Sequence, residues 1–137
     1  ISCAFGLGAA VQKVGLATLI AEQALTLSGN NPWLLLIMIY AVTSILTEMI
    51  TNNAAAIIMF PIAMSGAATL GVSEIPFAVA VMIAASASFV TPIGYQTNLM
   101  VYGPGGYQFS DYIKLGVPLS ILTASTALWL IPQIWAF

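Results

Sequence analysis

The sequence has 137 residues, of which 61% are hydrophobic and only 4% are charged, and its formal net charge is −2. A typical soluble domain carries about 25% charged residues, so this chain lacks the polar surface that a water-soluble globule needs. Two lysines, no arginine and no histidine exclude nucleic-acid binding through phosphate neutralisation. Lipid is the solvent that fits, and we expect an integral membrane protein of the prokaryotic inner (plasma) membrane.

Groups that perform catalysis are scarce. The sequence has no histidine, no Gly-x-Ser-x-Gly motif, no phosphate-binding loop and no close pair of carboxylates. Cys3 is the single cysteine, which excludes a disulfide framework and a Cys/His zinc site within the chain. We expect Cys3 to behave as a small hydrophobic residue. The sequence therefore predicts neither enzyme activity nor a cofactor.

Residues 1–28 are apolar but are interrupted by two polar pairs, at 12–13 and 22–23. We expect residues 1–11 to be the end of a membrane helix. Residues 14–27 are expected to form a shorter helix at the interface or packed against the protein. The sequence opens in an apolar run without a methionine or the charged region of a signal peptide, so we expect a truncated piece of a longer protein.

Residues 32–70 predict a helix that turns back in a hairpin. Pro32 suits the first turn of a helix, where its missing N–H costs nothing. At about 1.5 Å per residue, the apolar run 32–50 is roughly 28 Å long, close to the ~30 Å hydrocarbon core. A second apolar run, 54–70, follows after only a few polar residues. The tip of the hairpin is therefore expected at Thr51, Asn52 and Asn53.

Residues 76–102 predict a helix that is broken within the membrane. The apolar arm 76–90 is short for a full crossing, and it runs into the polar segment 91–98. There Pro92 lacks a main-chain donor and Gly94 frees the backbone. A short second apolar arm follows.

The last membrane span is predicted over residues 110–137. Ser110 is the expected N-cap, with Asp111 in the first turn, where the helix dipole favours a carboxylate. Trp129 and Trp135 lie towards the other end and suit the aromatic belt of a membrane interface.

Two polar clusters, at 47–53 and 88–98, stand out from the apolar sequence. Irregular backbone at membrane depth is tolerated only where it is buried in protein or lines a watered cavity. Freed carbonyls at such breaks suit Na⁺, whereas helix N-termini suit an anion, and transporters build this pair of sites from discontinuous helices. The pattern predicts an anion and a small cation bound side by side. Glu48 is either a proton or cation site or a brace for the hairpin tip.

The two clusters also carry a family resemblance. Residues 47–55 read Thr-Glu-Met-Ile-Thr-Asn-Asn-Ala-Ala, which resembles the Thr-Glu-x-x-Ser-Asn-Thr-Ala signature of the divalent anion:sodium symporter family. That family belongs to the wider ion-transporter superfamily, with the citrate-transporter-like permeases. Residues 88–98 read Ser-Phe-Val-Thr-Pro-Ile-Gly-Tyr-Gln-Thr-Asn and are similar to the family's Thr-Pro-x-Gly-x-x-x-Asn break. The likeness covers essentially the whole chain.

The resemblance implies an all-α integral membrane fold, with a re-entrant helical hairpin and a broken transmembrane helix in each of two inverted repeats of an elevator-type transporter. This chain resembles the C-terminal repeat, whose implied partners are the first repeat of the same protein and a second copy in a homodimer. The implied function is secondary active transport of a small divalent anion coupled to sodium, with this fragment supplying half of the substrate and sodium site. The implied substrate-binding residues are Thr51, Asn52, Asn53, Pro92, Gly94, Thr97 and Asn98. The implied sodium ligands are Thr47, Ile50, Asn52, Ser88 and Thr91.

Two departures from the family pattern bear on the substrate. Asn53 stands where the signature has threonine, and Tyr95-Gln96-Thr97 stands where many dicarboxylate carriers have Thr-Pro-Pro. Both features resemble the branch of large permeases with soluble regulatory domains, some of which are similar to sulfate transporters. The substrate is therefore expected to be sulfate or a dicarboxylate.

Two other functions stay open. The first is proton-coupled anion transport or exchange, with Glu48 as the proton carrier. The second is a membrane anchor or assembly segment without transport, although an anchor gains nothing from interrupted helices.

Overall fold

A computed structural model describes residues 6, 9, 10 and 13–137, and every regular element among them is a helix. The helices are α2 (Leu16–Ser28), α3 (Pro32–Met49), α4 (Asn52–Leu70), α5 (Ile75–Ser86), α6 (Gln96–Tyr102) and α7 (Phe109–Ile134). This confirms the predicted all-α fold. The expected membrane-helix end at 1–11 lies largely outside the described residues, and Cys3 lies entirely outside them.

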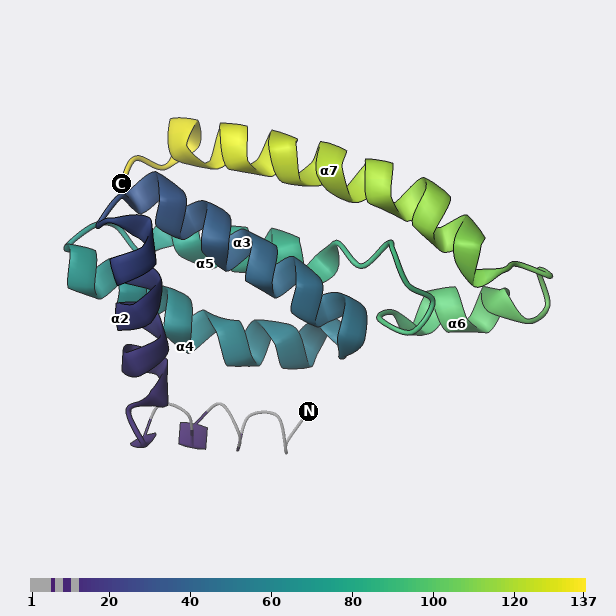
Figure 1. The fold of residues 1–137 in the computed structure, drawn as a ribbon, viewed down its shortest axis with the longest axis horizontal. Helices are drawn as coiled ribbons and strands as arrows, with labels where there is room; N and C mark the ends of the chain where they lie inside the picture. Colours follow the sequence, from purple (N-terminus) through teal and green to yellow (C-terminus); the bar gives the residue numbers. More distant parts are fainter. Residues whose placement is uncertain (1–5, 7–8, 11–12) are drawn as a thin grey trace.

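Helices α3, α4, α5 and α7 run along the long axis of the molecule, and α2 crosses them near one end (Figure 1). Helix α3 packs most extensively against α5, and α4 packs against α5, α2 and α3. The centre of this packing is apolar and built largely from alanine and aliphatic side chains. Fully buried members include Leu36, Ala63, Ala67, Phe77, Ala80 and Ala84. The alanines among them let the helices approach closely, as membrane helix packing requires.

Helix α2 is packed against the protein. It begins at Leu16, two residues later than predicted, because Gly15 adopts a left-handed conformation with φ of 71°. Ala17, Ala21 and Leu25 recur at intervals of four and are buried, so one face of the helix is committed to packing. The chain then turns at Gly29, and Asn31 caps α3 by accepting the N–H of Trp33 at 3.0 Å.

The turn of the hairpin is shorter than predicted. Helix α3 ends at Met49, and Asn52 is already the first residue of α4, so only Ile50 and Thr51 connect the two helices. Thr51 is the N-cap of α4 and accepts the N–H of Ala54 at 3.4 Å. The expected tip at 51–53 is therefore corrected to 50–51, with Asn53 in the first turn of α4. The re-entrant course of this hairpin stays a prediction.

The broken helix has a longer interruption than predicted. Helix α5 ends at Ser86 and α6 starts at Gln96, so residues 87–95, here called the break, are irregular. The expected arm 76–90 was too long because main-chain donors of the break bond to a side chain of α3, as described below, and not to α5. The second arm, expected to begin after the polar segment 91–98, already begins within it, as the first turn of α6.

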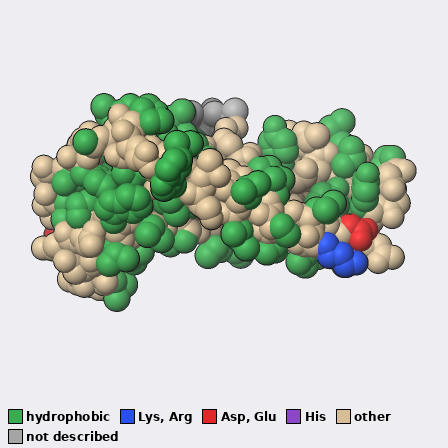
Figure 2. All heavy atoms as spheres, turned by 90° about the horizontal axis from the view of Figure 1, so that it is seen from above, with side chains coloured by type: hydrophobic (Ala, Val, Ile, Leu, Met, Phe, Trp, Pro, Cys, Tyr) green, Lys and Arg blue, Asp and Glu red, His purple; other side chains and the backbone are tan. Residues whose placement is uncertain are grey.

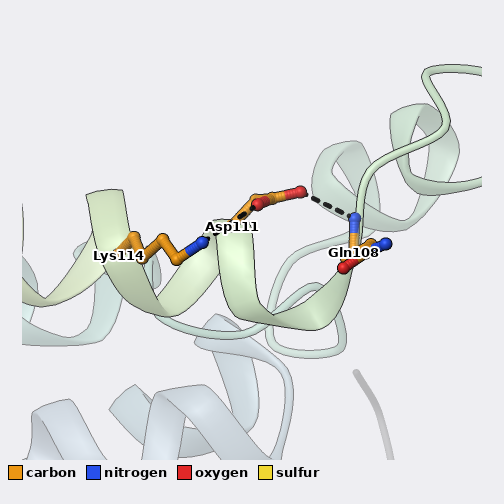
Figure 3. A network of polar contacts seen from close by, with 3 residues as sticks. All are labelled: Gln108, Asp111 and Lys114. Carbon is orange, nitrogen blue, oxygen red and sulfur yellow. Dashed lines mark hydrogen bonds and ion pairs between the residues drawn. The ribbon is translucent and has the colours of Figure 1, made fainter.

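Helix α7 is capped by Gln108, and the predicted N-cap at Ser110 is wrong. The Asp111 carboxylate accepts the main-chain N–H of Gln108 at 2.9 Å, so the third residue of the helix satisfies a donor at its N-cap (Figure 3). Lys114 lies 4.0 Å from Asp111 one turn further on. Asp111 lies in the first turn, as predicted, but it caps the chain from the third helical position.

The outer surface is strongly apolar. Figure 2 shows hydrophobic side chains over much of one face, with charged atoms confined to its ends. Helices α3, α4 and α7 are long and apolar enough to cross a membrane. On α7, Leu115, Ile121 and Leu122 are each more than 60% exposed, in contrast to the buried centre of the molecule. Such a surface fits contact with lipid or with other membrane helices.

Gly116 is where α7 docks on the break. A Cβ at Gly116 would collide with the Phe89 main chain and approach the Val90 Cα to 2.7 Å. We predict that Gly116→Ala lowers the stability of the full-length protein by about 1–3 kcal/mol, as overpacking does. Thermal unfolding in detergent measures this. Gly103→Ala is the matched control because a Cβ there meets nothing within 4 Å; equal melting temperatures for the two variants would contradict the close docking of α7.

Candidate functional site

The two polar clusters meet in space. The C-terminal end of α3, the N-terminal end of α4 and the break lie together beside a cleft of about 600 Å³. The cleft is lined by Thr51, Asn52, Asn53, Ala54, Ser86, Ile93, Gly94, Tyr95 and Gln96. The hairpin and the broken helix, well separated in sequence, therefore form one site.

The side-chain amide of Asn52 points at three oxygen atoms. One end of the amide lies 2.8 Å from Thr47 Oγ1 and 3.3 Å from the main-chain oxygens of both Ala85 and Gly94. Because the two ends of an Asn amide have nearly the same shape, either Nδ2 or Oδ1 fits this position. With Nδ2 there, the amide donates to all three oxygens. With Oδ1 there, four oxygens face one another with only the Thr47 hydroxyl hydrogen among them, so hydrogen bonding within the chain favours the orientation with Nδ2 inwards.

Ala85 O lies at this point because helix α5 stops one residue later, and Gly94 O belongs to the break. The last carbonyls of a helix have no partner within it. Thr47, which is fully buried, donates its hydroxyl to Ala85 O at 2.6 Å. No group of three His, Cys, Asp or Glu converges in the described part of the chain. Neutral oxygens from unwound backbone and a helix C-terminus are the donor set that transporters offer to Na⁺.

Glu48 joins α3 to the break. Its Oε1 accepts the main-chain N–H groups of Phe89 at 2.8 Å and Val90 at 3.0 Å, and its Oε2 accepts that of Thr91 at 2.8 Å. The Thr91 hydroxyl donates in return to the main-chain oxygen of Glu48 at 2.8 Å. Ser88 Oγ donates to Thr47 O at 3.3 Å. Of the two roles considered for Glu48, these contacts are those of a brace.

Asn98 serves the break from its other side. Its Nδ2 donates to Ser88 O at 3.2 Å and to Thr91 O at 3.3 Å, and the Tyr112 hydroxyl of α7 donates to Asn98 O at 3.0 Å. The carbonyls of Ser88 and Thr91, expected as sodium ligands, therefore face the Asn98 amide. Asn98 itself, expected to bind substrate, lines a separate cavity of about 300 Å³ between the break and α7.

The cleft offers neutral donors to an anion. Thr51, Asn53 and Gln96 bring a hydroxyl and two amides to its lining, and no lining residue is charged. The first main-chain N–H groups of α4 also lie at this end of the helix, where the helix dipole is positive. The lining can therefore bind an anion by hydrogen bonds, without an ion pair.

The structure brings only part of the predicted site together. Thr51, Asn52, Asn53 and Gly94 line the cleft, whereas Pro92, Thr97 and Asn98 do not. Thr47 and Asn52 meet at the four oxygens, but the other predicted sodium ligands, Ile50, Ser88 and Thr91, do not belong to that group. The main-chain oxygens of Ala85 and Gly94 complete that group. The sequence held one signal for Ala85, since it lies in the small-residue run just before the break.

A sequence profile of citrate transporters matches residues 1–137, which is the whole of the chain. The chain belongs to the citrate transporter family. This confirms the resemblance to divalent anion:sodium symporters and citrate-transporter-like permeases. Together with the apolar helices it makes the chain part of an integral membrane protein of a transporter family, and not an enzyme.

Its relatives are much longer. The uncharacterized transporter sll0640 of Synechocystis sp. is 46% identical over 127 residues, which cover 89% of this chain and 20% of that protein. Sodium/sulfate cotransporter 2 of Chlamydomonas reinhardtii is 40% identical over 123 residues, or 88% of this chain and 14% of that protein. Solute carrier family 13 member 4 of Homo sapiens is 29% identical over 118 residues, which cover 86% of this chain and 19% of that protein. The chain thus spans a fifth or less of the length of these relatives.

Gly94 is required where the break touches α3. A Cβ at Gly94 would collide with Ser88 Oγ and lie 2.5 Å from Thr47 O. We predict that Gly94→Ala moves the break off α3 and reduces anion uptake by the full-length protein at least about tenfold, the effect of about 1.4 kcal/mol. Initial uptake rates in proteoliposomes measure this, with Gly103→Ala as the control. Uptake that is unchanged in Gly94→Ala would mean that this contact does not support the site.

Proposed function

We propose that the full-length protein is a secondary active transporter that couples sodium to the movement of a small divalent anion, sulfate or a dicarboxylate. The observation that carries the proposal is the meeting of Thr47 Oγ1, the Asn52 amide, Ala85 O and Gly94 O beside a polar cleft. The oxygens suit Na⁺, and the cleft suits an anion. This fragment supplies half of that combined site.

Asn52 is the residue that belongs to both halves of the site. Its side chain faces the oxygens, and the residue also lines the cleft. With Na⁺ bound, Oδ1 turns to the ion, and Nδ2, on the opposite branch of the amide, is free to donate to the anion. Without Na⁺, Nδ2 turns inwards and this donor is lost to the cleft. Cation and anion therefore favour the same orientation of Asn52.

Sulfate is the first substrate to test. A relative 40% identical to this chain is named a sodium/sulfate cotransporter, which supports a sulfate-like cargo. The neutral lining of the cleft is compatible with sulfate and with a dicarboxylate, because both present oxygens to hydrogen-bond donors. The first repeat of the same protein would complete the site. We further propose a homodimer and an elevator-like movement of the hairpin and broken-helix unit, as in the family that the chain resembles.

Proton coupling through Glu48 is less favoured by the geometry. Both carboxylate oxygens already accept main-chain N–H groups, which is the bonding pattern of an ionised, acceptor-only carboxylate. A carrier that gains and releases a proton would have to break these contacts in each cycle. A purely anchoring role is also disfavoured, because an anchor has no use for converging oxygens beside a cleft.

We expect sodium-dependent accumulation of labelled sulfate or succinate in proteoliposomes that hold the full-length protein. Uptake is compared with a sodium gradient, with a proton gradient, and with neither. Accumulation of one anion under the sodium gradient supports the proposal and identifies the cargo class. Accumulation under a proton gradient alone would replace sodium by proton coupling, and no accumulation under any gradient would reject both anions as cargo.

We predict that Asn52→Ala abolishes uptake, because it removes both the cation ligand and the anion donor, while the protein remains folded. Gln133→Ala is the matched control, since it removes an exposed amide from α7, far along the chain from the site. Folding is checked by elution from a size-exclusion column and by melting temperature. Normal uptake by Asn52→Ala would remove Asn52 from the site.

A further inference from the structure

Glu48 stands out because it serves three consecutive main-chain donors of the break, those of Phe89, Val90 and Thr91. The irregular break cannot satisfy these N–H groups through a helix, and an unsatisfied one at membrane depth costs several kcal/mol. Glu48 is not among the residues that line the cleft. Its carboxylate is therefore turned to the break and not to the anion.

The contacts of Glu48 lead to the cation-facing oxygens through a short path. Thr91 Oγ1 donates to Glu48 O at 2.8 Å and accepts the N–H of Gly94 at 3.2 Å. Gly94 O is one of the oxygens that face the Asn52 amide. On the other side, Thr47, the neighbour of Glu48, holds Ala85 O. Fixing Glu48 to the break therefore fixes the two main-chain oxygens relative to the side chains of α3 and α4.

The charge of Glu48 adds to this arrangement. Glu22, Glu74, Asp111, Lys13 and Lys114 are the other charged residues of the chain, and none of them touches the break in the contacts described above. A negative charge adjacent in sequence to Thr47 favours a nearby cation. The three N–H dipoles that face the carboxylate weaken its field towards cation and anion alike, so the main contribution of Glu48 is to position the break.

We propose that Glu48 is a positioning residue for the coupling cation: it sets the break so that Gly94 O and Ala85 O face Asn52, and it binds neither substrate nor proton. The proposal rests on the proposed sodium-coupled transport. It differs from a general stabilising role, because it assigns the effect of Glu48 to the affinity for sodium and not to the affinity for the anion.

Glutamine cannot replace Glu48 in this role. Its amide has one oxygen where the carboxylate has two, so the NH₂ group must face either Thr91 N–H or the N–H groups of Phe89 and Val90. Aspartate keeps the charge and both oxygens but is one methylene shorter, so it reaches the same donors less well. Glu48→Gln therefore tests the charge and the number of acceptor oxygens, whereas Glu48→Asp tests the length of the side chain.

The test is sodium-dependent uptake by the full-length protein in proteoliposomes, for wild type, Glu48→Asp, Glu48→Gln and the control Glu22→Gln, which lies exposed on α2. We expect the sodium concentration for half-maximal uptake to rise about tenfold or more in Glu48→Gln, and less in Glu48→Asp. The anion KM at saturating sodium is expected to stay within about threefold of wild type, well below the tenfold that 1.4 kcal/mol produces. Glu22→Gln is expected to match wild type.

Several results would overturn the proposal. The first is an unchanged sodium concentration for half-maximal uptake in Glu48→Gln. The second is a variant in which only the KM for the anion rises. The third is uptake that depends on pH in wild type and does not depend on pH in Glu48→Gln. If Glu48→Gln does not fold, Glu48→Asp decides, because wild-type sodium half-saturation in a folded Glu48→Asp also contradicts the proposal. The proposed function is tested separately by wild type alone, since a wild-type protein without sodium-dependent uptake rejects sodium coupling before any variant is compared.

Discussion

The structure depends on satisfying the main-chain polar groups of a helix that is interrupted between apolar segments. Nothing in a hydrocarbon environment replaces the lost helical hydrogen bonds, so the protein must supply the partners itself. Glu48 accepts three donors of the break, and Asn98 donates to two of its carbonyls. Once these side chains have fixed the break, its Gly94 O and the nearby Ala85 O at the end of α5 face Asn52. The candidate site is thus built from main-chain oxygens at the interruption, after Glu48 and Asn98 have bonded the other polar groups of the break.

Sequence reasoning located the interruption but not its extent. Pro92 and Gly94 are local signals of a helix break, and the lengths of the apolar runs can be compared with the thickness of a membrane. The hairpin and the broken helix could therefore be expected from the sequence. The end of α5 at Ser86 could not, because small and apolar residues continue to Val90 without a proline or glycine. The helix ends because of a tertiary contact, in which the Glu48 carboxylate on α3 accepts the following main-chain N–H groups. Local propensity carries no information about a partner that is distant in sequence.

The same reason explains which site residues were found. Polar side chains such as those of Thr47 and Asn52 can be recognised in the sequence because the residues around them are apolar. Main-chain oxygens cannot, because every residue has one and only the fold decides which are free. The family resemblance implies Ser88 and Thr91 as sodium ligands, but it does not show whether their carbonyls are already paired. Asn98, counted among the anion's contacts, instead pairs with both. A polar residue near a binding site often serves the backbone that builds the site, and the sequence alone does not separate the two roles.

A site made of neutral groups has a consequence for coupling. The cleft lining contains no cationic side chain, so a divalent anion in it would be a poorly compensated charge in a medium of low dielectric, which is costly. Under the proposed function, a cation at the four neighbouring oxygens would compensate that charge, and the anion would do the same for the cation. As far as this half of the site decides, each ligand would then be bound weakly alone and well together, which is the proposed origin of the coupling. A permanent lysine or arginine at the cleft would bind the anion without sodium and would remove the reason for coupling.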